Sequence, residues 1–152
     1  MTQLTWNHRA LLLLRAALGV VFVLHGWQKL TVFGLSGLSG FLASSGMPLP
    51  TVNAAILITV ELVGGLALIA GLGTRVVSAL LAFTMAVAVG LVHLGNGFFV
   101  QNNGFEFPFT LMLVLLALVM TGAGAYSVDA RLFGSGRWVY CHSGMELPSV
   151  NR

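Results

Sequence analysis

Apolar stretches separated by turn-rich segments dominate the pattern of hydrophobic and polar positions along the chain. Runs of about 20 mostly apolar residues are typical of helices that cross a bilayer. The pattern predicts four such helices, over about 10–30, 51–72, 76–94 and 107–124. Residues 31–50 are rich in Gly and Ser and end in two prolines, so we expect a loop there, with at most a short interfacial or re-entrant segment near 38–43.

The composition agrees with this pattern. The 152 residues are 57% hydrophobic and only 7% charged, and the mean hydropathy is +0.95, which excludes an ordinary soluble domain. The net charge is +3, but the seven Lys and Arg residues are scattered rather than clustered, so a nucleic-acid partner is not expected. The predicted fold class is an all-α integral membrane four-helix bundle, with the lipid bilayer as its surroundings.

The basic residues predict the orientation of this bundle. An even number of helices leaves six of the seven basic residues on one side and Lys29 alone on the other. Both termini are therefore expected in the cytoplasm. No small-x-small cleavage site directly follows the first apolar run, so we interpret that run as an uncleaved helix. Residues 1–129 are predicted to form the transmembrane domain, and residues 130–152 a polar cytoplasmic tail.

Ionisable residues inside the apolar stretches are the candidate site. Such groups cost several kcal/mol in hydrocarbon unless they face a bundle interior, a water-filled cavity or an opposite charge. At a rise of about 1.5 Å per residue, Glu61 lies near the midplane and the others nearer the outer surface. The predicted polar cluster opens outwards and comprises His25, Lys29, Glu61, His93 and Glu106. Arg15 shares a helix face with His25 and Lys29 but is expected to snorkel towards the cytoplasm.

Each candidate also has a purely structural interpretation. Glu61 with His25 or Lys29 would equally serve as an interhelical contact that fixes helix register, whereas Lys29, His93 and Glu106 would suit the interface as well as a site. Asn96, Phe98, Phe99, Phe105 and Phe107 are candidate pocket-lining residues, although the phenylalanines also fit an aromatic belt. The small residues Ser78, Ala82, Ala86 and Gly90 recur every four positions and predict helix packing, within the chain or in a homo-oligomer.

Redox and metal chemistry by the chain itself is restricted. Cys141 is the only cysteine, so a CxxC thiol relay is absent, and no metal site is predicted. Haem with His25 and His93 as axial ligands is disfavoured, because the estimated depths of the two residues differ by about 6 Å. No flavin, nucleotide or iron-sulfur motif is present, so any electrons would have to come from a protein partner.

Several short motifs together resemble the DoxX family of small bacterial membrane proteins. The resemblance covers about residues 11–129 and rests on HGWQKL at 25–30, Glu61 before a Gly-Gly pair, Thr74-Arg75, HLGNGFF at 93–99, NGFEFP at 103–108 and YSVD at 126–129. It implies a four-helix bundle in the bacterial inner membrane. Phe105 and Phe107 stand where the family pattern leads us to expect tyrosines, which removes two hydroxyls from the outer site.

The resemblance also guides the functional prediction. The family's founder is associated with a thiosulfate:quinone oxidoreductase, and other members are linked to oxidative stress, but no established catalytic residue can be carried over. We therefore predict an accessory subunit of a quinone-linked redox system, with quinone as the expected ligand. A non-enzymatic membrane scaffold and a small proton-coupled transporter centred on Glu61 are the alternatives.

Overall fold

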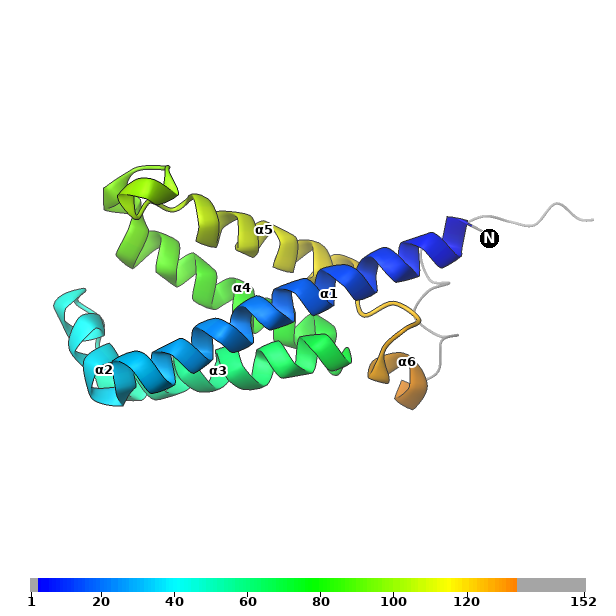
Figure 1. Cartoon of the computed structure of the whole chain (residues 1–152), viewed down its shortest axis with the longest axis horizontal. Helices are drawn as coiled ribbons and strands as arrows, with labels where there is room; N and C mark the ends of the chain where they lie inside the picture. Colours follow the sequence, from blue (N-terminus) through cyan, green and yellow to red (C-terminus); the bar gives the residue numbers. More distant parts are fainter. Residues whose placement is uncertain (1–2, 134–152) are drawn as a thin grey trace, which may run out of the picture.

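The computed structural model describes residues 3–133, and within that range the chain is helical and contains no strand. The helices are α1 (Gln3–Gln28), α2 (Gly34–Ser44), α3 (Pro50–Ala70), α4 (Thr74–Ala88), α5 (Glu106–Thr121) and α6 (Val128–Phe133) (Figure 1). One π-helical turn, Lys29–Phe33, joins α1 to α2, and a second, Val89–His93, extends α4. The 3₁₀ turns Leu94–Asn96 and Val100–Asn102 lie in the loop before α5. The predicted all-α class is confirmed.

Three helical stretches of the described chain are long and apolar enough to cross a membrane. They are Thr5–Ser44, Pro50–Ala70 and Thr74–Asn96. Helix α5 is also apolar but has only 16 residues. At 1.5 Å per residue it is roughly 24 Å long, compared with a hydrocarbon core of about 30 Å. The predicted multi-pass membrane bundle is therefore confirmed, with α5 its shortest member.

The prediction of a loop over residues 31–50 was wrong for most of that segment, because α2 occupies its centre. Leu38 and Leu42 lie one turn apart on α2 and are buried against Ala54 and Ile58 of α3. This apolar contact between helices overrides the weak helix propensity of the glycines and serines. The short segment predicted near 38–43 is part of this helix.

Glycines allow α1 and α3 to pack closely. A Cβ atom placed on Gly65 would lie 2.8 Å from the carbonyl oxygen of Gly19, and one on Gly19 would lie 2.6 Å from the carbonyl oxygen of Gly65. Of the Gly-Gly pair that follows Glu61, Gly65 therefore makes the close approach to α1, whereas Gly64 faces Leu81 of α4 at an ordinary 3.4 Å.

The helices form two pairs that meet at one end and separate at the other. Helix α1 runs along α3, and α4 runs along α5 (Figure 1). The two pairs diverge towards the end that carries α2 and the loop before α5. The buried core that joins the pairs contains Leu18, Phe22, Leu68, Leu81, Ala82, Met85, Leu115 and Leu118. The molecule is therefore closed by packing at the end near the α3–α4 turn.

The small-residue ridge of α4 packs only along its first half. Ser78 and Ala82 are buried, whereas Ala86 and Gly90 are exposed. Apart from its chain neighbours and the backbone of its own helix, no atom lies within 4 Å of a Cβ placed on Gly90. The predicted packing face therefore does not extend along the whole helix within this chain, because α4 diverges from the other pair at that point.

The prediction that Arg15 snorkels was wrong, since its side chain is fully buried. Its guanidinium donates one hydrogen bond to the carbonyl of Leu68 at 3.2 Å and another to the carbonyl of Tyr126. Arg15 therefore ties α1 to the end of α3 and to the segment that follows α5. The prediction considered only the distance from Arg15 to water along its own helix. It failed because the segment after α5 folds back over this end of the bundle.

Asp129 in α6 fastens the segment after α5 to the same end of the bundle. Its carboxylate accepts hydrogen bonds from the backbone N–H groups of Gly73 at 2.7 Å and Thr74 at 3.0 Å, and so caps the start of α4. Helix α6 crosses the predicted boundary between residues 129 and 130. Beyond Phe133, the predicted tail, which includes Cys141, lies outside the described residues.

Candidate functional site

A cavity of about 940 Å³ lies between the α1–α2–α3 layer and the α4–α5 pair, where the two helix pairs diverge. Its volume is within the range of small-molecule sites, about 300–1,000 Å³. Apolar side chains form most of its wall. The polar or ionisable residues that line it are His25, Gln28, Lys29, Ser45, Asn53, Glu61, Thr84, His93 and Asn103.

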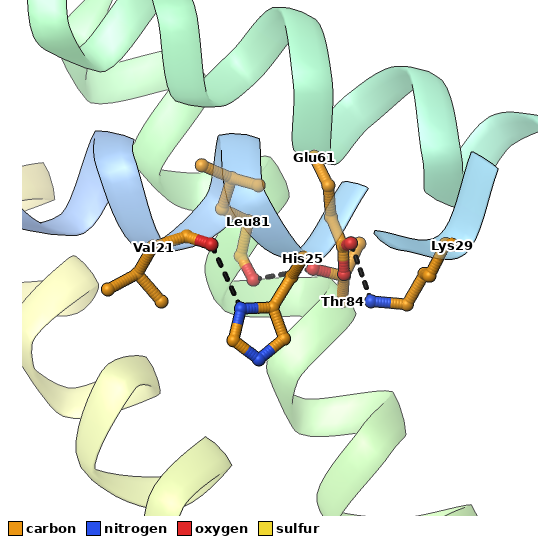
Figure 2. A network of polar contacts seen from close by, with 6 residues as sticks. All are labelled: Val21, His25, Lys29, Glu61, Leu81 and Thr84. Carbon is orange, nitrogen blue, oxygen red and sulfur yellow. Dashed lines mark hydrogen bonds and ion pairs between the residues drawn. The ribbon is translucent and has the colours of Figure 1, made fainter. Parts of the chain in front are cut away.

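An ion pair crosses the wall of this cavity. Lys29 Nζ lies 2.6 Å from Glu61 Oε2, which links the π-helical turn after α1 to the middle of α3 (Figure 2). The Glu61 side chain is 2% exposed and that of Lys29 is 20% exposed. The sequence left His25 and Lys29 as alternative partners of Glu61. In the structure Glu61 pairs with Lys29, and His25 makes other contacts.

His25 has a defined hydrogen-bond state. Its Nδ1 lies 2.9 Å from the carbonyl oxygen of Val21, one turn earlier in α1. Because a carbonyl only accepts, Nδ1 carries the hydrogen, and Nε2 of the neutral ring is an acceptor. Figure 2 shows this second nitrogen pointing away from α1. The ring also stacks on Phe107 of α5, with centroids 5.9 Å apart and an interplanar angle of 27°.

His93 is held in the same way by the loop before α5. Its Nδ1 lies 2.7 Å from the carbonyl oxygen of Asn103, which also accepts a hydrogen bond from the side-chain amide of Asn96 at 3.3 Å. Asn103 adopts a left-handed conformation with φ of 60°, and this directs its carbonyl towards both donors. Nε2 of neutral His93 is again an acceptor.

Glu106, the first residue of α5, bonds to the preceding loop and does not line the cavity. Its Oε2 accepts the backbone N–H of Val100 at 3.1 Å, which closes the loop onto the start of α5. Phe98 makes edge-on ring contacts with Phe99 and Phe105, at centroid distances of 5.5 and 5.4 Å. These residues stabilise the loop conformation that positions His93.

The predicted site residues thus fall into two groups. Those that line the cavity are His25, Lys29, Glu61, His93 and Phe107. Those that instead belong to the adjoining loop or its junction with α5 are Asn96, Phe98, Phe99, Phe105 and Glu106. Their functional roles stay predictions.

Sequence reasoning missed several polar residues of the wall, including Gln28, Ser45, Asn53, Thr84 and Asn103. Thr84 is an isolated hydroxyl in an apolar helix, and nothing local distinguishes it from other threonines in similar helices. Only the packing of the helices selects it. Within residues 3–133, no group of three or more His, Cys, Asp and Glu side chains is placed to hold a metal ion.

Comparisons with known proteins agree with this architecture. The family model of DoxX matches residues 10–94. A Bacillus subtilis protein named "Putative oxidoreductase CatD" is 35% identical over 80% of this chain and 86% of its own length. An uncharacterized Haemophilus influenzae protein is 36% identical, covering 79% of this chain and 88% of its own.

A third relative points to the location in the cell. The Escherichia coli inner membrane protein YqjF is 34% identical over 80% of this chain and 90% of its own length. No solved structure matches the chain. The family match, the inner-membrane relatives and the apolar helices together identify this chain as a multi-pass inner-membrane protein of the DoxX family.

Proposed function

We propose that this protein binds a quinone headgroup in the cavity between its helix pairs and acts as an accessory subunit of a quinone-linked redox system. The observation that carries the proposal is the combination of polar and aromatic groups in one largely apolar cavity. The Lys29–Glu61 pair and the stacked rings of His25 and Phe107 both line this cavity. The name of the Bacillus subtilis relative supports a redox role.

The residues present fit a flat ring with polar substituents. Aromatic rings favour offset stacking at centroid separations of about 4.5–7 Å, and Phe107 and His25 offer such a surface. The ammonium of Lys29 has two N–H donors beyond the one used by Glu61. A bound quinone would supply the two-electron chemistry, and a protein partner would deliver or take the electrons, since the sequence carries no other redox motif.

The test is to identify what the purified protein retains. Native mass spectrometry in mild detergent, combined with solvent extraction of the same sample, is expected to detect a stoichiometric quinone in the wild type. Glu61→Gln and His25→Ala are expected to reduce that amount several-fold. Glu106→Gln is the matched control, because this carboxylate pairs with the loop and does not line the cavity.

A folded wild-type protein that retains only bulk phospholipid, and takes up no added quinone, would overturn the proposal. The Lys29–Glu61 pair would then be interpreted as an interhelical contact in a membrane scaffold. Equal quinone retention in all variants would place the ligand outside this cavity and would also contradict the proposal.

A further inference from the structure

The histidines of the cavity have already donated their hydrogens. Nδ1–H of His25 is directed at Val21 and Nδ1–H of His93 at Asn103, in each case at a backbone carbonyl oxygen. The two residues lie on different walls of the cavity, on α1 and on the π-helical turn after α4. Each neutral ring therefore has its Nε2 lone pair left for a ligand.

The two hydroxyls that line the cavity have also donated their hydrogens to backbone carbonyls. Thr84 Oγ1 donates to the carbonyl of Leu81 at 2.8 Å, as drawn in Figure 2. Ser45 Oγ donates to the carbonyl of Phe41 at 3.0 Å. A hydroxyl has one hydrogen, so each of these oxygens has only lone pairs left to offer.

The carboxylate of Glu61 adds a further acceptor. Its Oε2 accepts from Lys29, and an ionised carboxylate has no hydrogen to donate. Against these acceptors, the donors that remain are the ammonium of Lys29 and the side-chain amides of Gln28, Asn53 and Asn103, and each amide also carries an acceptor oxygen. Five lining side chains can thus only accept, whereas Lys29 can only donate. The free hydrogen-bonding capacity of the cavity is therefore weighted towards acceptors.

We propose that the cavity favours the reduced, hydroxyl-bearing form of a quinone headgroup, the quinol, over the oxidised form. This rests on the proposed function. A quinone offers only carbonyl oxygens, which the ammonium and amide donors can bind, but it leaves the lone pairs of the histidines, hydroxyls and carboxylate without a partner. A quinol offers two O–H donors. Buried polar groups without a partner cost about 1–3 kcal/mol each, so one pairing difference already discriminates by about tenfold.

This preference has a redox consequence. Tighter binding of the reduced form raises the reduction potential of the bound couple relative to the free one. For a two-electron couple, each tenfold preference corresponds to about 30 mV. The quinone–quinol couple bound in the cavity would therefore have a higher reduction potential than the same couple free in the membrane.

The test compares two redox forms of one ligand on the full-length protein in lipid nanodiscs. Isothermal titration calorimetry under anaerobic conditions would use a short-tailed benzoquinone, its quinol and the dimethyl ether of that quinol. The quinol is expected to bind about tenfold more tightly than the quinone. The ether keeps the ring but has no O–H donor, so it is expected to lose the advantage.

Two variants connect the preference to named residues. His25→Phe keeps a ring against Phe107 but removes the Nε2 acceptor, and is expected to lower the quinol preference severalfold. Thr84→Val removes a hydroxyl acceptor, and Thr110→Val is its matched control because Thr110 makes a similar bond to the carbonyl of Glu106 outside the cavity. Thr84→Val remains informative if His25→Phe does not fold.

The outcomes separate the two proposals. Equal or tighter binding of the quinone by the wild type would overturn the preference while the proposed function stands. Binding of neither form would overturn both. A wild-type preference that His25→Phe and Thr84→Val leave unchanged would overturn the assignment to these acceptors.

Discussion

Buried charges in this chain are compensated by partners from distant parts of the sequence. Arg15 bonds to carbonyls 53 and 111 residues away, and Lys29 reaches Glu61 across 32 residues. Removing one partner of a buried charge costs more than removing both, because the remaining group loses hydration without gaining a contact. The stability of the variants is therefore expected to depend on which groups remain.

Arg15→Met is expected to destabilise the folded protein by about 3 kcal/mol, because the carbonyls of Leu68 and Tyr126 lose their donor and Asp129 loses a favourable nearby charge. Thermal unfolding in detergent would measure the change. Arg131→Met is the matched control, since Arg131 is exposed on α6. Equal unfolding temperatures for the two variants would contradict the assigned role of Arg15.

Lys29→Met is expected to destabilise by about 3 kcal/mol, because Glu61 stays buried without its cation. The double variant Lys29→Met/Glu61→Met is expected to regain most of that stability, since no uncompensated charge remains. A double-mutant cycle from unfolding in detergent measures the coupling. Additive effects of the two single changes would show that the ion pair does not form.

At the scale of the helices, side-chain size determines how closely neighbours pack. The crossing of α1 and α3 depends on Gly19 and Gly65, whereas α2 is held to α3 by leucines. The Gly-Gly pair predicts a close approach from sequence alone. Which partner each glycine faces depends on the rotation of α3, which the local sequence does not specify.

Gly65→Ala is expected to destabilise the protein by about 2 kcal/mol, because the new methyl would lie 2.8 Å from a backbone oxygen that cannot move independently of α1. Gly64→Ala is the adjacent control. Its methyl would make ordinary contact with Leu81, and alanine favours the helix over glycine. Thermal unfolding would compare them, and an equal loss in both variants would refute this packing.

At the scale of the whole molecule, the diverging helix pairs create the cavity. The core that joins the pairs occupies the end near the α3–α4 turn. The ionisable residues that line the cavity lie beyond this core, towards α2. The distribution of basic residues predicts that this closed end faces the cytoplasm and that the cavity opens outwards.

Reporter fusions test this orientation. Green fluorescent protein fused to the C-terminus is expected to fluoresce, because it would fold in the cytoplasm. Alkaline phosphatase fused after Gln101, in the exposed loop before α5, is expected to be active outside the membrane. The reverse pattern would invert the bundle and place the cavity on the cytoplasmic side.

Much of the candidate site was predictable from ionisable residues in apolar stretches. His25, Lys29, Glu61 and His93 stand out because hydrocarbon does not tolerate such groups without a reason. Thr84 and Ser45 do not stand out, because a hydroxyl in a helix can satisfy itself on its own backbone wherever it lies. Glu106 stood out equally but bonds within its loop.

The sequence by itself determined the class of this protein, its four main apolar helices and the need for partners to its ionisable residues, because these follow from the cost of placing polar groups in a bilayer. Only the tertiary structure decided that Lys29 rather than His25 pairs with Glu61, and that Arg15 is buried beneath the segment after α5. Such partners are many residues apart. Their meeting depends on helix rotation and crossing, which are set by packing between elements rather than by any local pattern.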